Sequence, residues 1–428
     1  MPWPIFRRSS RQIVLTIFLP FTAAYLISEL YRNVNGVIAP ELRQTFDIGP
    51  VGLGFLSSVF LIAIAAAQIP VGVLLDRYGS RRVVAPMLLL AAAGAVLFTM
   101  PSYPAAVGGR LLLGLGLGAC WAGAYRANVL SWPRERLPLV NGALLGLSGL
   151  GALAATRPVE AVLSLISWQS FFLGLAAITT LLAILIFAVV PSESEDIDAS
   201  GSETLAEVLH GFRKVVGHPL FRRVWPLTFM CEGTWLAYQG LWGGVWLRQV
   251  SDLDSTAAAN VLFAFALAIV VGQIVLSGLT GWLVKRGARL EWMMAGITGG
   301  FIATQCFIAF FPRAMPTASW TSLGLLTAGP ILAYAWLTTE LPHAWAGRVV
   351  SLINLCATLA GFLLQYAVGG LIDLFSIVSG SEPNAQRWAF GLLIGGEATA
   401  LLWFLASNWL PRRMWATQVR EVAGQIDR

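Results

Sequence analysis

Long apolar runs dominate this chain, and short polar segments separate them. Twelve runs are long enough to cross a bilayer as helices, since about 20 apolar residues cover its hydrocarbon core. A lipid-facing backbone must satisfy its own hydrogen bonds, and the runs show no alternation with a period of two, so helices are expected rather than strands. The predicted spans are residues 12–38, 49–75, 83–101, 104–130, 138–163, 168–191, 223–248, 256–283, 291–312, 317–340, 349–376 and 388–410.

One long polar insert, residues 192–222, divides the spans into two groups of six. It begins acidic and ends basic, and residues 203–216 have the pattern of a short amphipathic helix. The predicted organisation is an N-terminal six-helix bundle (1–191), a cytoplasmic linker (192–222), a C-terminal six-helix bundle (223–410) and a cytoplasmic tail (411–428). Two six-span halves around a loop suggest a transporter built from repeats, with its binding site between the halves.

The composition supports a membrane protein. Of the 428 residues, 57% are hydrophobic and 12% are charged, whereas a soluble domain carries about 25% charged residues. This excludes a disordered chain, a disulfide scaffold and an ordinary soluble enzyme, and it predicts an all-α polytopic membrane protein. The four cysteines lie in apolar runs without the spacing of metal ligands. We therefore expect neither a bound metal nor a cofactor.

The distribution of basic residues predicts the orientation. Of the 28 Lys and Arg residues, 20 fall on one side of the predicted spans, 4 on the other and 4 inside spans. Cytoplasmic loops are rich in Lys and Arg, so both termini are expected in the cytoplasm. This bias also accounts for the net charge of +6 without nucleic acid. The expected location is the bacterial inner membrane, or a membrane derived from it.

A charged loop follows the second span. It reads Gly-Val-Leu-Leu-Asp-Arg-Tyr-Gly-Ser-Arg-Arg, and its candidate gating residues are Gly72, Asp76, Arg77, Gly79, Arg81 and Arg82. The glycines permit a tight turn, and the aspartate can pair with a basic group or a helix N-terminus. A weaker echo, residues 281–287, follows span eight with Lys285 in place of the acid. The alternative is an ordinary charged loop.

This loop resembles the signature loop of the major facilitator superfamily, and the resemblance extends over essentially the whole chain. The run from Arg110 to Gly118 is similar to the span-four motif of that superfamily. Residues 29–42 resemble the first span of its anion:cation symporters, and the spacing of Arg32 and Pro40 resembles its organophosphate:phosphate antiporters. The resemblance implies two pseudo-symmetric six-helix bundles, transport by alternating access, and contact between Arg32 and an anionic substrate.

Charged residues inside spans are costly, so each one suggests a function. Arg32 lies near the middle of span one, and Glu29 lies one turn earlier on the same face. A guanidinium binds carboxylate or phosphate in a bidentate way and stays charged, so Arg32 and the nearby Asn35 are candidates for anion binding. Glu29 is a candidate proton carrier. The alternative is a structural ion pair.

Other polar residues in the spans complete the predicted site. Glu232 is a second candidate for proton coupling, because an apolar setting favours a protonated carboxyl group, and Glu397 is a third. Arg110 is equally consistent with coupling or with packing, and Arg126 could bind substrate or extend to the membrane interface. The further candidate substrate contacts are aromatic and amide side chains of spans seven and ten: Trp235, Tyr238, Gln239 and Tyr334.

The predicted function is secondary active transport of a small organic anion, coupled to protons or to a counter-anion, by a monomer in a lipid bilayer. Two alternatives stay open. One is transport of iron, a metal or a metal chelate, as by magnetosome-type facilitators, or export of a drug in exchange for protons. The other is a membrane sensor or scaffold without transport, since Tyr31 and Leu117 replace acids that the symporters carry. No set of residues for enzyme catalysis was found.

Overall fold

A computed structural model describes residues 9–191, 205–342 and 345–407, and its regular elements are helices throughout that part of the chain. The elements of the first half are α1 (Ser10–Ile13), η2 (Val14–Phe18), α2 (Leu19–Asn33), α3 (Asn35–Phe46), α4 (Pro50–Phe98), α5 (Tyr103–Leu117), α6 (Cys120–Ser131), η3 (Arg134–Arg136), α7 (Leu137–Ala154), α8 (Arg157–Leu163) and α9 (Trp168–Val189). Those of the second half are α10 (Leu205–Gly217), α11 (Pro219–Ala237), η5 (Tyr238–Trp242), α12 (Gly243–Gln249), α13 (Ser255–Lys285), α14 (Leu290–Phe310), α15 (Pro316–Leu326), α16 (Ala328–Glu340), α17 (Ala346–Ser379) and α18 (Glu382–Ala406).

Nine helices in the described residues are long and apolar enough to cross a membrane. One of them, α4, has 49 residues and is interrupted at Gly79, whose φ of 78° is left-handed. Glycine adopts this conformation without steric cost, so the chain turns there between two predicted spans. The two predicted spans that are not among these nine helices are the seventh, which is divided into α11–η5–α12, and the tenth, which is divided into α15–α16. The prediction of an all-α polytopic membrane protein is confirmed, and these helices are consistent with twelve spans.

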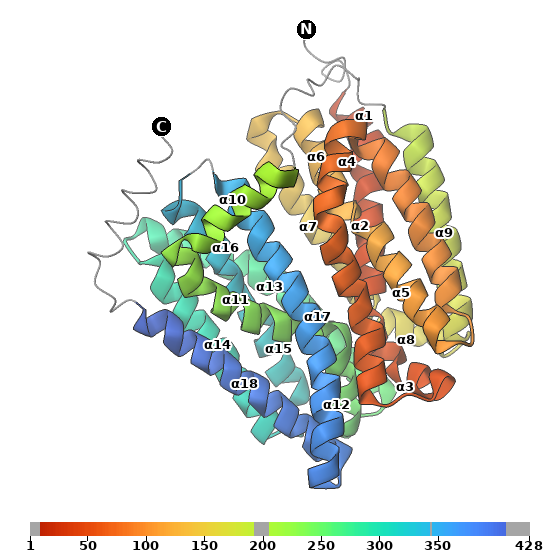
Figure 1. Cartoon of the computed structure of the whole chain (residues 1–428), viewed down its shortest axis with the longest axis vertical. Coiled ribbons are helices and arrows are strands. Elements are labelled where there is room, and N and C mark those ends of the chain that lie inside the picture. Colours follow the sequence, from red (N-terminus) through yellow and green to blue (C-terminus); the bar gives the residue numbers. More distant parts are fainter. Residues whose placement is uncertain (1–8, 192–204, 343–344, 408–428) are drawn as a thin grey trace.

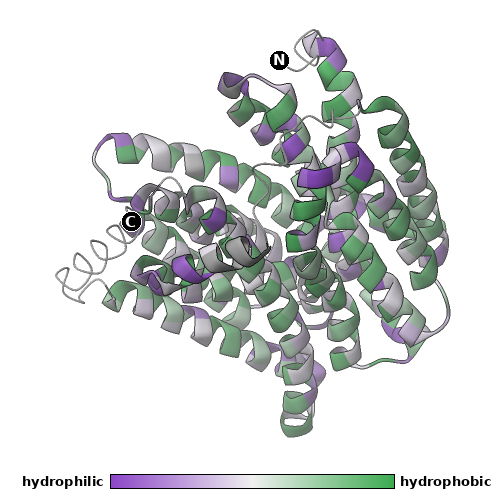
Figure 2. Cartoon of the chain, turned by 45° about the horizontal axis from the view of Figure 1, so that its top comes forward, coloured by the Kyte–Doolittle hydropathy of each residue, from purple (hydrophilic) through white to green (hydrophobic). Residues whose placement is uncertain are grey.

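The helices form two bundles, α1–α9 and α11–α18 (Figure 1). Hydrophobic residues run along the helices, while hydrophilic residues gather at helix ends and turns (Figure 2). Large apolar side chains also cover the outside of the bundles: Leu181, Ile274 and Leu402 are each about two-thirds exposed. An apolar outer surface of this kind suits contact with lipid rather than water.

The bundles meet near one end of the molecule. We call this end the α3 side; the other end, which carries α10 and the Gly79 turn, is the α10 side (Figure 1). Backbones touch on the α3 side: a Cβ on Gly244 would lie 2.1 Å from the carbonyl oxygen of Gly36, and one on Gly369 would lie 2.5 Å from that of Pro50. Small residues allow helices to pack this closely.

The polar insert holds a helix where an amphipathic one is predicted. Helix α10 covers Leu205–Gly217 and packs against α11 and α17. The rest of the predicted linker up to residue 204, and the predicted tail 411–428, lie outside the described residues. A second left-handed glycine, Gly287, ends the echo of the charged loop after α13. The two related segments therefore turn at corresponding glycines, although their charges differ.

Candidate functional site: a charged cavity between the two bundles

A small cavity lies between the two bundles, close to the predicted arginine of span one. Both halves contribute to its wall, through α2 and α4 on one side and α11, η5 and α17 on the other. The lining residues are Arg32, Asn33, Ser57, Phe60, Leu61, Leu236, Gly240 and Gln365. The wall thus combines one permanent positive charge, three neutral polar side chains and an apolar remainder.

Arg32 is the only charged residue in this lining. Its guanidinium pairs with Glu29, one turn earlier on the same face of α2. The Arg32 side chain is 27% exposed and that of Glu29 is 8% exposed, so the arginine borders open space while the acid lies behind it. The Nε atom of Arg32 is buried without a hydrogen-bond partner. The predicted ion pair is present, and its arginine keeps unused capacity to bind an acceptor.

Two asparagines fix the chain around this pair. Asn33 donates from Nδ2 to the carbonyl oxygen of Glu29 at 2.7 Å. Asn35 is fully buried and donates from Nδ2 to Ser57 Oγ at 2.9 Å, which leaves its Oδ1 without a partner. Asn35 therefore lies behind the lining residue Ser57, and it contributes to the cavity through that contact.

Arg110 is buried next to the same stretch of α2 and lies outside the cavity lining. Its side chain donates from Nη1 to the carbonyl oxygen of Tyr31 at 3.2 Å. The guanidinium also lies over the rings of Phe60 and Phe98, with 4.7 Å and 5.6 Å to the ring centroids. These contacts hold the residue before Arg32 and the lining residue Phe60 against α5, so Arg110 acts on the cavity through its neighbours.

The predicted residues of spans seven and ten separate into two groups. Glu232 is buried and accepts a hydrogen bond from Tyr334 at 3.2 Å, and its Oε1 has no partner. Trp235 and Gln239 are partly buried, and Trp235 Nε1 and Gln239 Oε1 also lack partners. Tyr238 instead stacks on Phe390 of α18 at 4.4 Å between ring centroids. Its ring therefore packs inside the second bundle.

Arg126, a predicted substrate contact, forms an ion pair with a residue of the charged loop. Arg126 on α6 pairs with Asp76 on α4 at 2.5 Å, on the α10 side. It is absent from the lining of the cavity described above. Arg126 thus lies beside Asp76, a predicted gating residue. Its contact with substrate stays a prediction.

The other residues of the charged loop lie around the Gly79 turn. The side chain of Arg81 donates to the carbonyl oxygen of Val190 at 3.2 Å and covers the ring of Phe187 at 4.6 Å. Arg77 lies over the ring of its neighbour Tyr78. Arg82 is next to the turn, and Gly72 faces open space on α4. These contacts of Asp76 and Arg81 are all within the first bundle.

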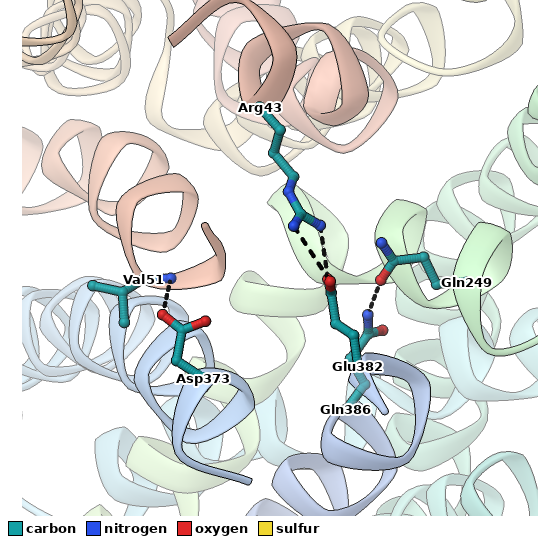
Figure 3. A network of polar contacts seen from close by, with 6 residues as sticks. All are labelled: Arg43, Val51, Gln249, Asp373, Glu382 and Gln386. Carbon is teal, nitrogen blue, oxygen red and sulfur yellow. Dashed lines mark hydrogen bonds and ion pairs between the residues drawn. The ribbon is translucent and has the colours of Figure 1, made fainter. Parts of the chain in front are cut away.

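A polar network on the α3 side joins the two bundles (Figure 3). Arg43 of α3 forms a bidentate pair with Glu382 of α18, at 2.7 and 3.3 Å. Asp373 of α17 accepts from the backbone N–H of Val51, at the N-terminus of α4, at 3.1 Å. Here a negative charge meets the positive end of a helix dipole. Glu382 also lies one turn from Gln386, which bonds to Gln249.

Sequence reasoning missed most of the neutral wall of the cavity. Ser57, Phe60 and Leu61 of α4 and Gln365 of α17 are ordinary residues in apolar spans, and no charge or motif marks them. Among the described residues, no group of three or more His, Cys, Asp or Glu residues is arranged to hold a metal.

Comparisons with known proteins agree with this architecture. The sequence model of the Major Facilitator Superfamily matches residues 21–365. The chain belongs to this superfamily. A solved bacterial homolog of the human lysosomal transporter Spinster superposes with a TM-score of 0.76 at 16% identity, covering 94% of this chain and 98% of that one. This likeness supports the fold of a major facilitator protein.

Two curated relatives are transporters of named solutes. A probable sulfoacetate transporter of Cupriavidus necator is 25% identical over 82% of this chain and 85% of its own. The 3-(3-hydroxy-phenyl)propionate transporter of Escherichia coli is 24% identical over 92% of this chain and 95% of its own. This member of the Major Facilitator Superfamily is thus a multi-pass membrane protein of a transporter family, and its relatives carry small molecules.

Proposed function

We propose that this protein is a secondary transporter of a small organic anion, coupled to protons, and that Arg32 binds the anion. The observation that carries the proposal is the position of Arg32: its guanidinium borders a cavity between the halves, keeps a free Nε, and is otherwise held by an acid of its own helix. A permanent cation inside the membrane is costly, and such residues mark the path of a substrate or ion. We therefore infer that Arg32 binds an anion.

Glu29 gives this arrangement a route to proton coupling. With no substrate present, ionised Glu29 neutralises Arg32. An incoming carboxylate or sulfonate competes for the same guanidinium, and protonation of Glu29 releases Arg32 to it. The site is then neutral again, with one proton on Glu29 and one anion on Arg32. Because an uncompensated charge is costly inside the membrane, this exchange favours the uptake of one proton with each negative charge.

The named solutes of the two relatives fit this chemistry. Sulfoacetate carries a carboxylate and a sulfonate, and 3-(3-hydroxy-phenyl)propionate carries a carboxylate on an aromatic body. Both have an anionic group for a guanidinium and a remainder that the neutral wall can contact. In this proposal the lining residues Gln365 and Phe60 contact the polar and the apolar part of the substrate. Gln239 and Trp235 are not part of the lining, and they would contact the substrate from beside Gly240 and Leu236.

Alternating access follows from the arrangement of the bundles. We assign the α10 side to the cytoplasm, since the basic residues of the chain concentrate in its segments. The α3 side then faces out, and its contacts between the bundles close the cavity toward that side. The charged loop around Gly79 and the Asp76–Arg126 pair belong to the cytoplasmic gate. We expect a monomer in the bacterial inner membrane, or in a membrane derived from it.

The experiment is uptake into proteoliposomes, with sulfoacetate and 3-(3-hydroxy-phenyl)propionate as probes and an inward proton gradient. Replacing Arg32 by Ala removes a charge-assisted bond to the anion, and we expect uptake to fall by about 10- to 150-fold, from the 1.5–3 kcal/mol typical of such bonds. Arg32→Lys keeps the charge and loses the bidentate geometry, so a smaller loss is expected.

Arg157 offers a matched control. It also pairs with an acid three residues away, Glu160, but it lies outside the cavity lining. Arg157→Ala should retain most of the uptake. Equal losses in both variants, or full uptake in Arg32→Ala, would reject the assignment of Arg32. Flux of an iron chelate or a drug instead of the anions would favour the alternative substrates, and binding without flux would favour a sensor.

A further inference from the structure

A second acidic site lies inside the C-terminal bundle, away from the cavity between the halves. Glu397 of α18 is fully buried, and Gln305 of α14 is 1% exposed. Gln305 Nε2 donates to Glu397 Oε2 at 2.8 Å. The carboxyl group and the amide therefore face each other across two helices, sealed from solvent.

Each of these two side chains also has one buried oxygen without a hydrogen-bond partner: Oε1 of Glu397 and Oε1 of Gln305. Both orphan atoms are acceptors. A buried acceptor without a donor costs about 1–3 kcal/mol, and a carboxyl group and an amide can form a cyclic pair with two parallel hydrogen bonds. One such bond is already formed. The Thr234 hydroxyl of α11 also lies next to Glu397 and can donate to its carboxyl group, but Gln305 Oε1 still lacks a donor. A single proton on Glu397 Oε1 would supply it.

Within the part of the chain that the structure describes, no basic side chain pairs with Glu397. Helix α18 packs against α11, α12, α14 and α17. The basic side chains of these helices lie near helix ends: Arg348 begins α17, and the other four have partners elsewhere, since Arg222 donates to the carbonyl oxygen of Val216, Arg223 pairs with Glu291, Arg248 donates to the carbonyl oxygen of Gly36, and Arg387 donates to that of Ala309. Arg387 is ten residues from Glu397, which is about 15 Å along a helix.

The titratable groups near Glu397 are also acids. Cys231 of α11 and Tyr238 of η5 lie within electrostatic reach of Glu397, so a negative charge on either would repel one on Glu397. Another negative charge among these groups would add repulsion to the cost of burial. An isolated ion in a low-dielectric interior is far more costly than its neutral form.

We propose that Glu397 and Gln305 form a proton-binding site, in which a protonated Glu397 donates to Gln305 Oε1 and accepts from Gln305 Nε2. The site joins α18 to α14, and α18 also packs against α11. Helix α11 continues into η5, whose Gly240 lines the cavity. A π-helical turn in this place is typical of functional positions. The inference does not depend on the transported solute, since it concerns a proton held outside the cavity.

Infrared spectroscopy of the purified, reconstituted full-length protein tests the site directly. A protonated carboxyl group has a C=O stretching band distinct from that of a carboxylate. At neutral pH we expect the wild type to show such a band that is lost in Glu397→Gln. Gln305→Leu should shift the same band, because it removes the amide partner. A Glu397→Gln spectrum with the protonated-carboxyl bands unchanged would overturn the proposal.

Thermal unfolding gives an independent readout. Glu397→Gln reproduces the hydrogen-bond pattern of the neutral acid, so it should match the wild-type Tm at acidic pH, where the unfolded chain is also protonated, and Glu397→Ala should lower it. As the pH rises above the pKa of an exposed glutamate, about 4.3, the unfolded wild type loses the proton that the folded site keeps. The wild type should therefore lose stability relative to Glu397→Gln over this range. A sodium ion bound by the same oxygens is the competing outcome: a rise in wild-type Tm with sodium over choline, absent in Glu397→Gln, would also overturn the proton site.

Discussion

The two sides of the molecule differ in how their charged groups pair. On the α3 side, Arg43 of the first bundle pairs with Glu382 of the second. On the α10 side, Asp76 pairs with Arg126 inside the first bundle, and Arg223 pairs with Glu291 inside the second. Of these three ion pairs, the one on the α3 side joins the bundles and the two on the α10 side each lie within one bundle, while Gln68 of α4 and Thr358 of α17 form a hydrogen bond between the bundles at 3.5 Å. In the proposed alternating access, the Arg43–Glu382 pair would have to break when the α3 side opens, and the pairs within one bundle could remain.

The close backbone approach on the α3 side should give the largest effect when it is disturbed. A Cβ on Gly244 would lie 2.1 Å from the carbonyl oxygen of Gly36 in the other bundle. Gly244→Ala therefore forces the bundles apart, and overpacking of this kind costs about 1–3 kcal/mol. We expect the population with an open α3 side to rise by about 5- to 150-fold, from the same range of energies.

Electron–electron distance measurements can follow this opening. Spin labels at Leu165 and Ile377 suit the experiment, because these residues are 84% and 83% exposed and belong to different bundles. Gly244→Ala should lengthen the distance between the labels. The control is Gly278→Ala, since a Cβ on Gly278 meets nothing within 4 Å. An unchanged distance in Gly244→Ala would show that this contact does not hold the bundles together.

The ion pair of the α3 side should give a smaller effect. The side chains of Arg43 and Glu382 are 27% and 28% exposed, so water screens part of their attraction. Such pairs are typically worth about 0.2–1 kcal/mol. Glu382→Ala should therefore raise the open population by about fivefold at most, and the effect should shrink at high salt.

A charge swap decides whether the pair itself is responsible. Arg43→Glu alone places two acids opposite each other and should lengthen the label distance more than Glu382→Ala does. Combining it with Glu382→Arg restores opposite charges, and the distance should return toward that of the wild type. A double variant that opens as far as Arg43→Glu alone would assign the contact to packing instead of charge.

How far the sequence predicts these two sides depends on the kind of signal. Apolar runs mark the spans because a membrane imposes their length, and Gly79 marks the turn in α4 because only a tight, left-handed backbone fits there. Arg32 stands out because a charge in an apolar run is costly. These signals depend on residues that are close in the sequence. The structure has helices at the apolar runs, a turn at Gly79 and a cavity beside Arg32.

Features that depend on contact between distant helices gave no such signal. Ser57 and Gln365 line the cavity only because α4 and α17 pack together, more than 300 residues apart. Arg126 carries the same kind of charge as Arg32, yet its partner Asp76 is determined by the packing of α6 on α4. Tyr238 stacks on Phe390 of α18. A residue type predicts that a partner exists; the packing of helices decides which one.

The pair on the α10 side should give the smallest effect of all. Asp76 is 53% exposed and its partner Arg126 belongs to the same bundle, so the contact does not cross between the halves. Asp76→Asn removes a solvent-screened attraction, and we expect the distance between labels at Leu165 and Ile377 to stay within its wild-type distribution. Glu382→Ala, measured with the same labels, provides the positive control. If Asp76→Asn moved the labels as far as Glu382→Ala does, pairing within a bundle would influence closure of the α3 side as strongly as pairing across it, and the contrast between the two sides would no longer identify which contacts hold the bundles together.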